Sequence, residues 1–204
     1  MGFSLDEWNQ KFGNQDLSAS TRKSGGGTYF TPEMDVTYGV TINSATVTTG
    51  PGGDVQLELQ TSVTDAAGSE DLGATKIWVT LPYQESDLKA TDPESVNKRT
   101  LRRRDDLNRL FSKAVPATFA LYASKDGKNF LDFDGKVMTK EMFSDREVAI
   151  NIATLDKAAE LHGQVGQTVD ELAGVHLYII WKENPQNEKY PFMNLYPNLP
   201  KAKK

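Results

Sequence analysis

Apolar and polar residues alternate along the chain between residues 34 and 82. The first alternating run covers 36–42, and Ala45 and Val47 continue it on the opposite parity. A period of two is typical of a strand with one buried face. A change of parity inside such a run indicates one extra residue in the strand. We therefore predict a long strand with a β-bulge at Asn43-Ser44.

Two further runs of the same kind follow, at 55–63 and 76–81. The glycine- and proline-rich segment 50–54 separates the first two strands and predicts a hairpin turn. A small, acidic loop at 66–73 connects the second strand to the third, which Pro82 ends. The pattern thus predicts three consecutive antiparallel strands.

After residue 91 the apolar spacing becomes helical. Asp92-Pro93-Glu94 is a typical helix start, because proline fits the first turn and acids suit the positive end of the helix dipole. Apolar residues then recur at helical spacing up to Val115-Pro116, and a proline disfavours helix in the residue before it. We predict a helix over 93–115, whereas residues 117–124 fit a strand or a helix.

The C-terminal half mixes both periods. Alternation predicts strands at 148–152, 175–181 and 190–196, and Pro191 places the last of these at a sheet edge or start. A short helix is expected over 155–162, ended by Gly163. Three strands cannot close a barrel alone, so these later strands are expected to complete one. The expected class is mainly β with helical insertions (α+β), arranged as an OB-like antiparallel β-barrel.

The expected domain organisation is simple. Residues 1–13 form an amphipathic helix, 14–29 a flexible linker rich in Ser and Gly, 30–200 a single barrel domain, and 201–204 a basic tail. Leu5, Trp8 and Phe12 share one face of the first helix, which is too short to be stable alone. That face is expected to dock on the protein's own core or, in a homo-oligomer, on a neighbouring subunit.

Composition narrows the functional classes. The chain has 204 residues, 38% of them apolar, and no apolar run long enough to predict a membrane span. It has no cysteine and two histidines, which leaves no basis for a catalytic or metal site, and we predict neither an enzyme nor a cofactor. Asp132 and Asp134 share a strand face but are better interpreted as a turn beside Gly135. The absence of cysteine fits the cytoplasm, or the host cytoplasm if the protein is viral.

One charge feature stands out in a chain with a net charge of −5. The segment 98–113 carries seven bases against two acids. Binding of single strands needs cations along the phosphates and flat side chains under the bases. The candidate nucleic-acid-binding residues are Lys98, Arg99, Arg102, Arg103, Arg104, Arg109, Trp78, Tyr83, Tyr178 and Trp181. The alternative is that the arginines form a solvated helix face paired with acids and that Trp78 and Trp181 belong to the core.

The order of these elements resembles that of bacteriophage single-stranded DNA-binding and recombination-associated proteins with an OB-fold. The resemblance covers about Thr31 to Pro200. It is carried by Thr31-Pro32-Glu33, the hairpin to 55–63, Lys76-Ile77-Trp78-Val79-Thr80-Leu81-Pro82, Leu107-Asn108-Arg109-Leu110, and the closing segments 172–181 and 190–194. It implies a groove lined by basic and aromatic residues. Many such proteins end in an acidic tail, whereas this chain ends in Lys201-Ala202-Lys203-Lys204.

The predicted function is sequence-neutral binding of single-stranded DNA, protecting or organising it during phage replication or recombination, with RNA as an alternative ligand. The predicted partner is the nucleic acid itself, together with a second copy of the chain through its N-terminal helix. A different class is also considered, namely a structural or assembly protein with a β-sandwich fold that oligomerises through that helix.

Overall fold

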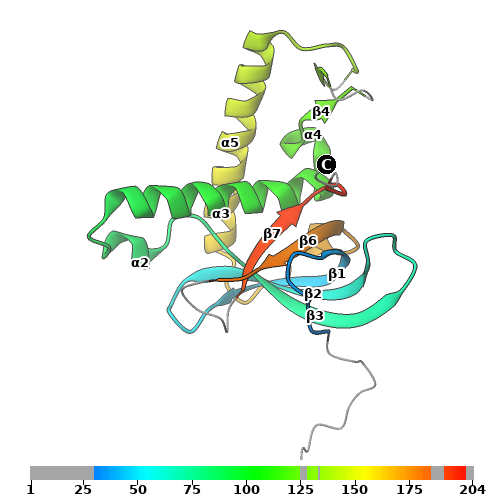
Figure 1. Cartoon of the computed structure of the whole chain (residues 1–204). Helices are drawn as coiled ribbons and strands as arrows, with labels where there is room; N and C mark the ends of the chain where they lie inside the picture. Colours follow the sequence, from blue (N-terminus) through cyan, green and yellow to red (C-terminus); the bar gives the residue numbers. More distant parts are fainter. Residues whose placement is uncertain (1–29, 125–127, 133, 185–190, 201–204) are drawn as a thin grey trace, which may run out of the picture.

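The computed structural model describes residues 30–124, 128–132, 134–184 and 191–200 (Figure 1). Within them, five antiparallel strands form one sheet in the order β3-β2-β1-β6-β7. The strands are β1 (Thr37–Thr49), β2 (Val55–Asp65), β3 (Asp71–Thr80), β6 (His176–Lys182) and β7 (Phe192–Tyr196). The predicted segments 1–13, 14–29 and 201–204, and Tyr190 of the last predicted strand, lie outside the described residues.

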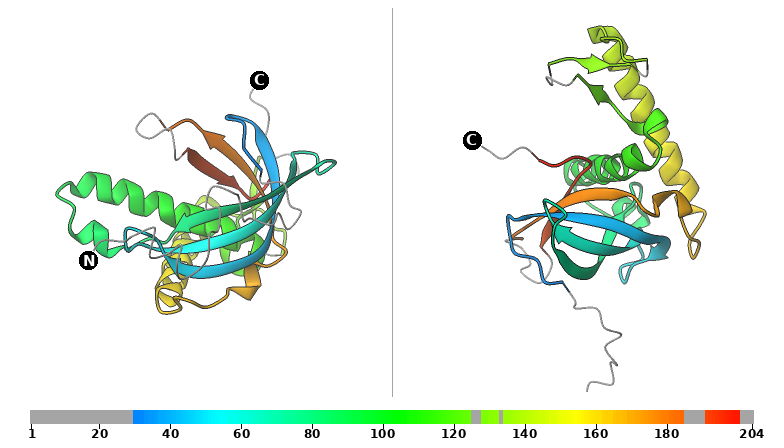
Figure 2. Two further views of the ribbon diagram at one scale, coloured as in Figure 1. Left: turned by 90° about the horizontal axis from the view of Figure 1, so that it is seen from below. Right: turned by 90° about the vertical axis from the view of Figure 1, so that its right-hand side faces the viewer.

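All the described helices lie between β3 and β6 in the chain. They are α2 (Glu85–Leu88), α3 (Pro93–Ala114), α4 (Pro116–Phe119), α5 (Lys140–His162) and a 3₁₀ turn, η1 (Asp170–Leu172). A short hairpin of β4 (Tyr122–Ala123) and β5 (Phe130–Leu131) follows α4. Figures 1 and 2 show α3 lying against the sheet, while α4, the short hairpin and the first half of α5 project away from it.

Several local predictions are confirmed. The pairing of β1 with β2 shifts register between Ile42 and Ser44, where the change of parity predicts a bulge. The turn at 50–54 joins β1 to β2. Helix α3 begins after Asp92, whose carboxylate accepts a hydrogen bond from the backbone N–H of Glu94. These features are local, so the residue pattern alone is enough to predict them.

The predicted strand at 148–152 is wrong, because these residues lie inside α5. Thr139 caps that helix by accepting a hydrogen bond from the backbone N–H of Met142. Ile150 is buried while Val148 and Ile152 are exposed. Three alternating apolar residues are too few to separate a strand from a helix with apolar residues on both sides. The predicted helix over 155–162 is the last part of the same α5.

One hydrophobic core joins the sheet to α3. The alternating residues of the strands point inward, as with Leu57, Leu59 and Ile179, and Leu107 and Phe111 of α3 pack against them. The predicted α+β class with antiparallel strands is confirmed, and the sheet in the described residues has five strands. Residues 117–124, which the pattern left open, form α4 and then β4. In the described ranges no helix is both long and apolar enough to cross a membrane.

Candidate functional site

The end of β3, the first half of α3 and the start of β7 surround a hollow of about 270 Å³. We call it the Trp78 hollow. Four predicted residues meet there, namely Trp78, Arg99, Arg102 and Arg103. Its lining is Trp78, Val79, Thr80, Arg99, Arg102, Arg103, Asp106, Pro191, Phe192 and Met193. Segments more than a hundred residues apart in the chain thus contribute to a single surface feature.

Trp78 presents an open aromatic surface in this hollow. It lies on the outer face of β3 and is 50% exposed, while its neighbours Ile77 and Val79 are buried. Glu58 is its cross-strand partner on β2. The Lys76 ammonium, hydrogen-bonded to the Glu58 carboxylate at 2.7 Å, holds the pKa of that carboxyl below its usual range, and a hydrogen bond from Trp78 acts in the same direction. The carboxylate therefore lies beside the indole on the same face of the sheet.

Arg102 faces a second aromatic ring across the hollow. Its guanidinium carbon lies 5.2 Å from the centroid of the Phe192 ring, within the range of a cation–π contact. One guanidinium nitrogen donates to the backbone carbonyl of Met193 at 3.3 Å. Phe192 is 38% exposed and was not among the sequence candidates. Its position after Pro191, at the exposed start of the last predicted strand, is the feature of the sequence that could have indicated it as a site residue.

Asp106 places a carboxylate within the same basic surface. It lies 3.9 Å from the Arg102 guanidinium and 3.0 Å from that of Arg109. Burial raises the pKa of Asp106, although both arginines act in the opposite direction. The hollow therefore contains one acid whose charged form is disfavoured by its surroundings.

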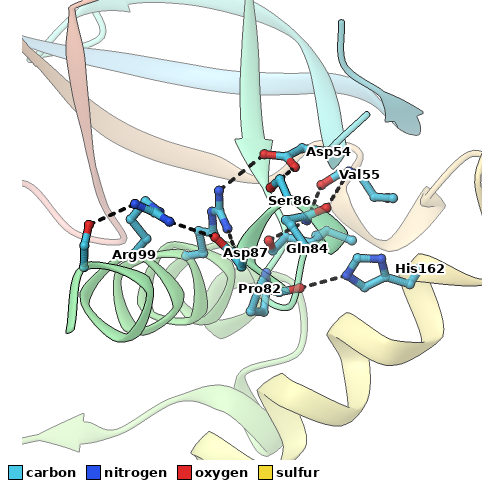
Figure 3. A network of polar contacts seen from close by, with 11 residues as sticks. Asp54, Val55, Pro82, Gln84, Ser86, Asp87, Arg99 and His162 are labelled. Carbon is cyan, nitrogen blue, oxygen red and sulfur yellow. Dashed lines mark hydrogen bonds and ion pairs between the residues drawn. The ribbon is translucent and has the colours of Figure 1, made fainter. Parts of the chain in front are cut away.

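Arg103 has a structural role, which Arg99 shares in part. Its side chain is only 16% exposed and pairs with Asp87 at 2.5 Å and with Asp54 at 3.4 Å. Arg99 also reaches Asp87, at 3.2 Å, and bonds Ser95 on its own helix. Figure 3 shows these contacts tying α3 to α2 and to the turn between β1 and β2. Arg103 therefore anchors the helix.

Gln84 completes this network from the segment between β3 and α2. It is 3% exposed, and its side-chain carbonyl accepts the backbone N–H of Val55 at 2.8 Å. Its side-chain NH₂ donates to the backbone carbonyls of Val55 and Leu81, at 2.9 and 2.7 Å (Figure 3). The ring of His162, at the end of α5, contacts the carbonyl of Pro82 at 2.8 Å. These bonds determine where the chain leaves β3, and so where Trp78 lies relative to α3.

The tertiary structure surrounds the basic block with acids. Each of the six predicted bases has a carboxylate oxygen within 4 Å. The pairs not yet described are Lys98 with Glu94 and Arg104 with Asp105. Most of the positive charge seen in the sequence is thus compensated locally. Arg99 and Arg102, whose side chains remain about half exposed, are the predicted cations of the hollow best placed to meet an anion.

The other predicted aromatics lie elsewhere. Trp181 is 8% exposed and packs against Phe30 and Tyr38, with ring centroids 5.7 Å away in each case, so it is a core residue. Tyr83 is exposed and has a backbone φ of 61°, but it lies outside the hollow's lining. Tyr178 lines a different cavity, beside His176. Only Trp78 of the four is placed with the arginines.

The types of side chain in the hollow are relevant to the chemistry that it can support. In the part of the chain that the structure describes, no group of three or more His, Cys, Asp or Glu side chains is arranged to hold a metal ion. The hollow instead combines two partly exposed aromatic rings with two partly exposed arginines.

The chain was compared with protein-family models, with curated proteins and with solved structures, and none of them matches it.

Proposed function

We propose that the protein binds single-stranded nucleic acid, with single-stranded DNA as its ligand and little preference for sequence. One observation carries the proposal, namely that the Arg102 guanidinium lies over the Phe192 ring beside the half-exposed Trp78. Aromatic faces stack on any base, and arginines meet the phosphates between bases. Such a surface can hold a strand without reading the edges of its bases.

The arrangement of strands supports the same proposal. Three consecutive strands are followed by the helices and then by two more strands of the same sheet. We interpret this order as an OB-like barrel, a five-stranded and partly open architecture that often binds oligonucleotides. Trp78 lies on the third strand, and Phe192 begins the fifth strand of the sheet in chain order. In the proposed complex one base stacks on Trp78, while Arg99 and Arg102 contact the neighbouring phosphates.

Fluorescence anisotropy with a labelled oligo-dT tests this function. Binding is expected at about 50 mM salt and is expected to weaken strongly at about 200 mM, because phosphate contacts release counterions. Trp78→Ala is expected to weaken binding by about 5- to 100-fold, the usual effect of losing one stacked base. Phe130→Ala, which removes an exposed aromatic from the projecting hairpin, is the matched control. Absence of binding at low salt, or an affinity independent of salt, would refute the proposal.

Asp106→Asn is expected to tighten oligo-dT binding several-fold. The change removes a negative charge beside Arg102 and Arg109, and one charge near a phosphate is worth on the order of 1 kcal/mol. Because burial raises the pKa of Asp106, its charge is also lost as the pH falls through that raised value. The wild type should therefore gain affinity relative to Asp106→Asn as the pH falls through that raised value. Equal affinity of the two proteins at neutral pH would show that no phosphate passes close to Asp106.

A second candidate, an assembly protein, is favoured by one observation. Large apolar side chains are exposed on the projecting part of the chain, including Phe130, Val137, Val148 and Ile152. Exposed apolar groups that form one contiguous patch often mark a protein interface. Size-exclusion chromatography of the wild type, of Val148→Glu and of the chain without residues 1–13, alongside the anisotropy assay, separates the candidates. A large assembly that dissociates in either variant, in a protein that binds no oligonucleotide, would favour assembly.

A further inference from the structure

One face of α3 follows β7 along its length. Arg99, Arg102, Asp106, Arg109 and Lys113 recur every three or four residues, which places them on one side of the helix. Arg102 bonds the carbonyl of Met193 near the start of β7, and the Lys113 ammonium bonds the side-chain carbonyl of Asn198, just beyond its end, at 2.9 Å. Figure 1 shows β7 next to α3. We call this line of contact the α3–β7 seam.

The seam has hollows at both ends. The Trp78 hollow lies at the first end, and two cavities of about 480 and 550 Å³ lie at the other. These two share Lys113, Pro197 and Asn198 in their linings. Arg109 and Ser112 line one of them, and the His176–Tyr178 ring pair lines the other. Cations and an aromatic pair therefore occur together a second time.

The length of the seam suits a short single strand. From Arg99 to Lys113 the helix rises about 21 Å, at about 1.5 Å per residue. Stacked nucleotides advance about 3.4 Å each, so about six of them span this distance. Binding sites of about 4–16 nucleotides are usual for a single OB-like domain. A strand held at Trp78 can thus reach Lys113 without unusual extension.

Electrostatics favours this direction over the outer face of β2 and β3. On that face Glu58 neutralises Lys76, and the far ends of the two strands carry Asp65 and Asp71, with Glu70 in the loop between them. Hydrogen bonds, chiefly from the backbone of Glu70, lower the pKa of Asp65, which keeps it ionised. A strand leaving Trp78 across this face meets carboxylates. Along α3 it meets Arg102, Arg109 and Lys113, which outnumber the carboxylate of Asp106 on the same face.

We propose that a single strand bound at Trp78 continues along the α3–β7 seam to a second subsite, where Arg109 and Lys113 contact phosphates and Tyr178 stacks on a base. The inference rests on the proposed function. The Lys113–Asn198 bond is exposed, so a phosphate can replace Asn198 at small cost. Glu171 lines the same cavity, but its carboxylate is paired with the ammonium of Lys157 at 2.5 Å.

The test compares Lys113→Glu with Lys136→Glu, which reverses the charge of an exposed lysine on the segment between β5 and α5. Anisotropy is measured with labelled oligo-dT of four and of eight nucleotides. Lys113→Glu is expected to weaken binding of the octamer about tenfold or more and to reduce its salt dependence. Its effect on the tetramer, which fits at Trp78 alone, should be below about twofold, and Lys136→Glu should affect neither.

Asn198→Ala is the second control, because it removes the Lys113–Asn198 bond and keeps the cation. It should leave octamer binding unchanged or tighten it. The inference is wrong if Lys113→Glu weakens octamer binding no more than Lys136→Glu, or if Asn198→Ala weakens it as much as Lys113→Glu. In either case Trp78→Ala still tests the proposed function separately. Absence of binding by the wild type at low salt would refute the function and the second subsite together.

Discussion

Replacing Gln84 by leucine is expected to lower the free energy of unfolding by about 2–4 kcal/mol. The Gln84 side chain bonds the N–H of Val55 and the carbonyl of Leu81 one step beyond the last β2–β3 pair, and so extends the ladder. Leucine fills a similar volume but bonds neither group. The carbonyl of Val55 is less affected, because it also accepts the N–H of Leu81 at 3.0 Å. The cost therefore comes mainly from the partly buried N–H of Val55 and the buried carbonyl of Leu81, which lose these partners.

Urea unfolding followed by circular dichroism measures this change. Gln60→Leu is the matched control, since Gln60 is exposed on the outer face of β2 and its side chain bonds the half-buried Glu58. That variant should lie within about 0.5 kcal/mol of the wild type. If Gln84→Leu is as stable as Gln60→Leu, the hydrogen bonds of Gln84 do not hold the start of β2 to the end of β3.

Arg103→Ala is expected to cost about 2–3 kcal/mol of stability, whereas Arg102→Ala should cost less than about 1 kcal/mol. Removing Arg103 leaves Asp87, which is nearly buried, with Arg99 as its remaining cation, and leaves Asp54 with the hydroxyl of Ser86. Arg103→Lys should recover only part of the loss, because an ammonium cannot reproduce the planar fork that meets two carboxylates. Arg102 is half exposed and its nearest carboxylate is 3.9 Å away.

The two variants should also separate stability from binding. Arg102→Ala is expected to stay folded and to lose about tenfold or more in oligo-dT affinity, since its guanidinium lies over Phe192. Thermal unfolding and anisotropy on the same samples check both quantities. If Arg103→Ala unfolds at the same temperature as Arg102→Ala, the anchoring role assigned to the Asp54–Asp87–Arg103 network is wrong.

Local pattern was enough for most of the secondary structure. Strict alternation predicts β1, β2, β3 and β6, and the parity change at Asn43 predicts the bulge, because side chains on a strand point to alternate faces. The helix cap at Asp92 is equally local. Residues 148–152 were misassigned because α5 carries apolar side chains on its buried and its exposed sides. Such a helix gives no clear period in a short segment.

The candidate site was only partly predictable. The sequence places Trp78 on a strand face and the arginines on one helix, but the face that is buried depends on what packs against it. Trp181 also lies in an alternating strand, and it is buried because Phe30 and Tyr38 cover it. The sequence does not predict Phe192 as a site residue, because its contribution to the site depends on its contact with Arg102, ninety positions earlier in the chain.

By itself, the sequence determined the long strands, the main helix, the density of positive charge on that helix and the absence of cysteine chemistry. These follow from residue type and spacing over a few turns or strand lengths. The tertiary structure alone decided which charges remain available, because Asp54 and Asp87 reach Arg103 from other elements. It also brought Phe192 to Trp78 and Lys113 to Asn198. Contacts between residues far apart in the chain depend on how the elements pack, and a local pattern does not record that packing.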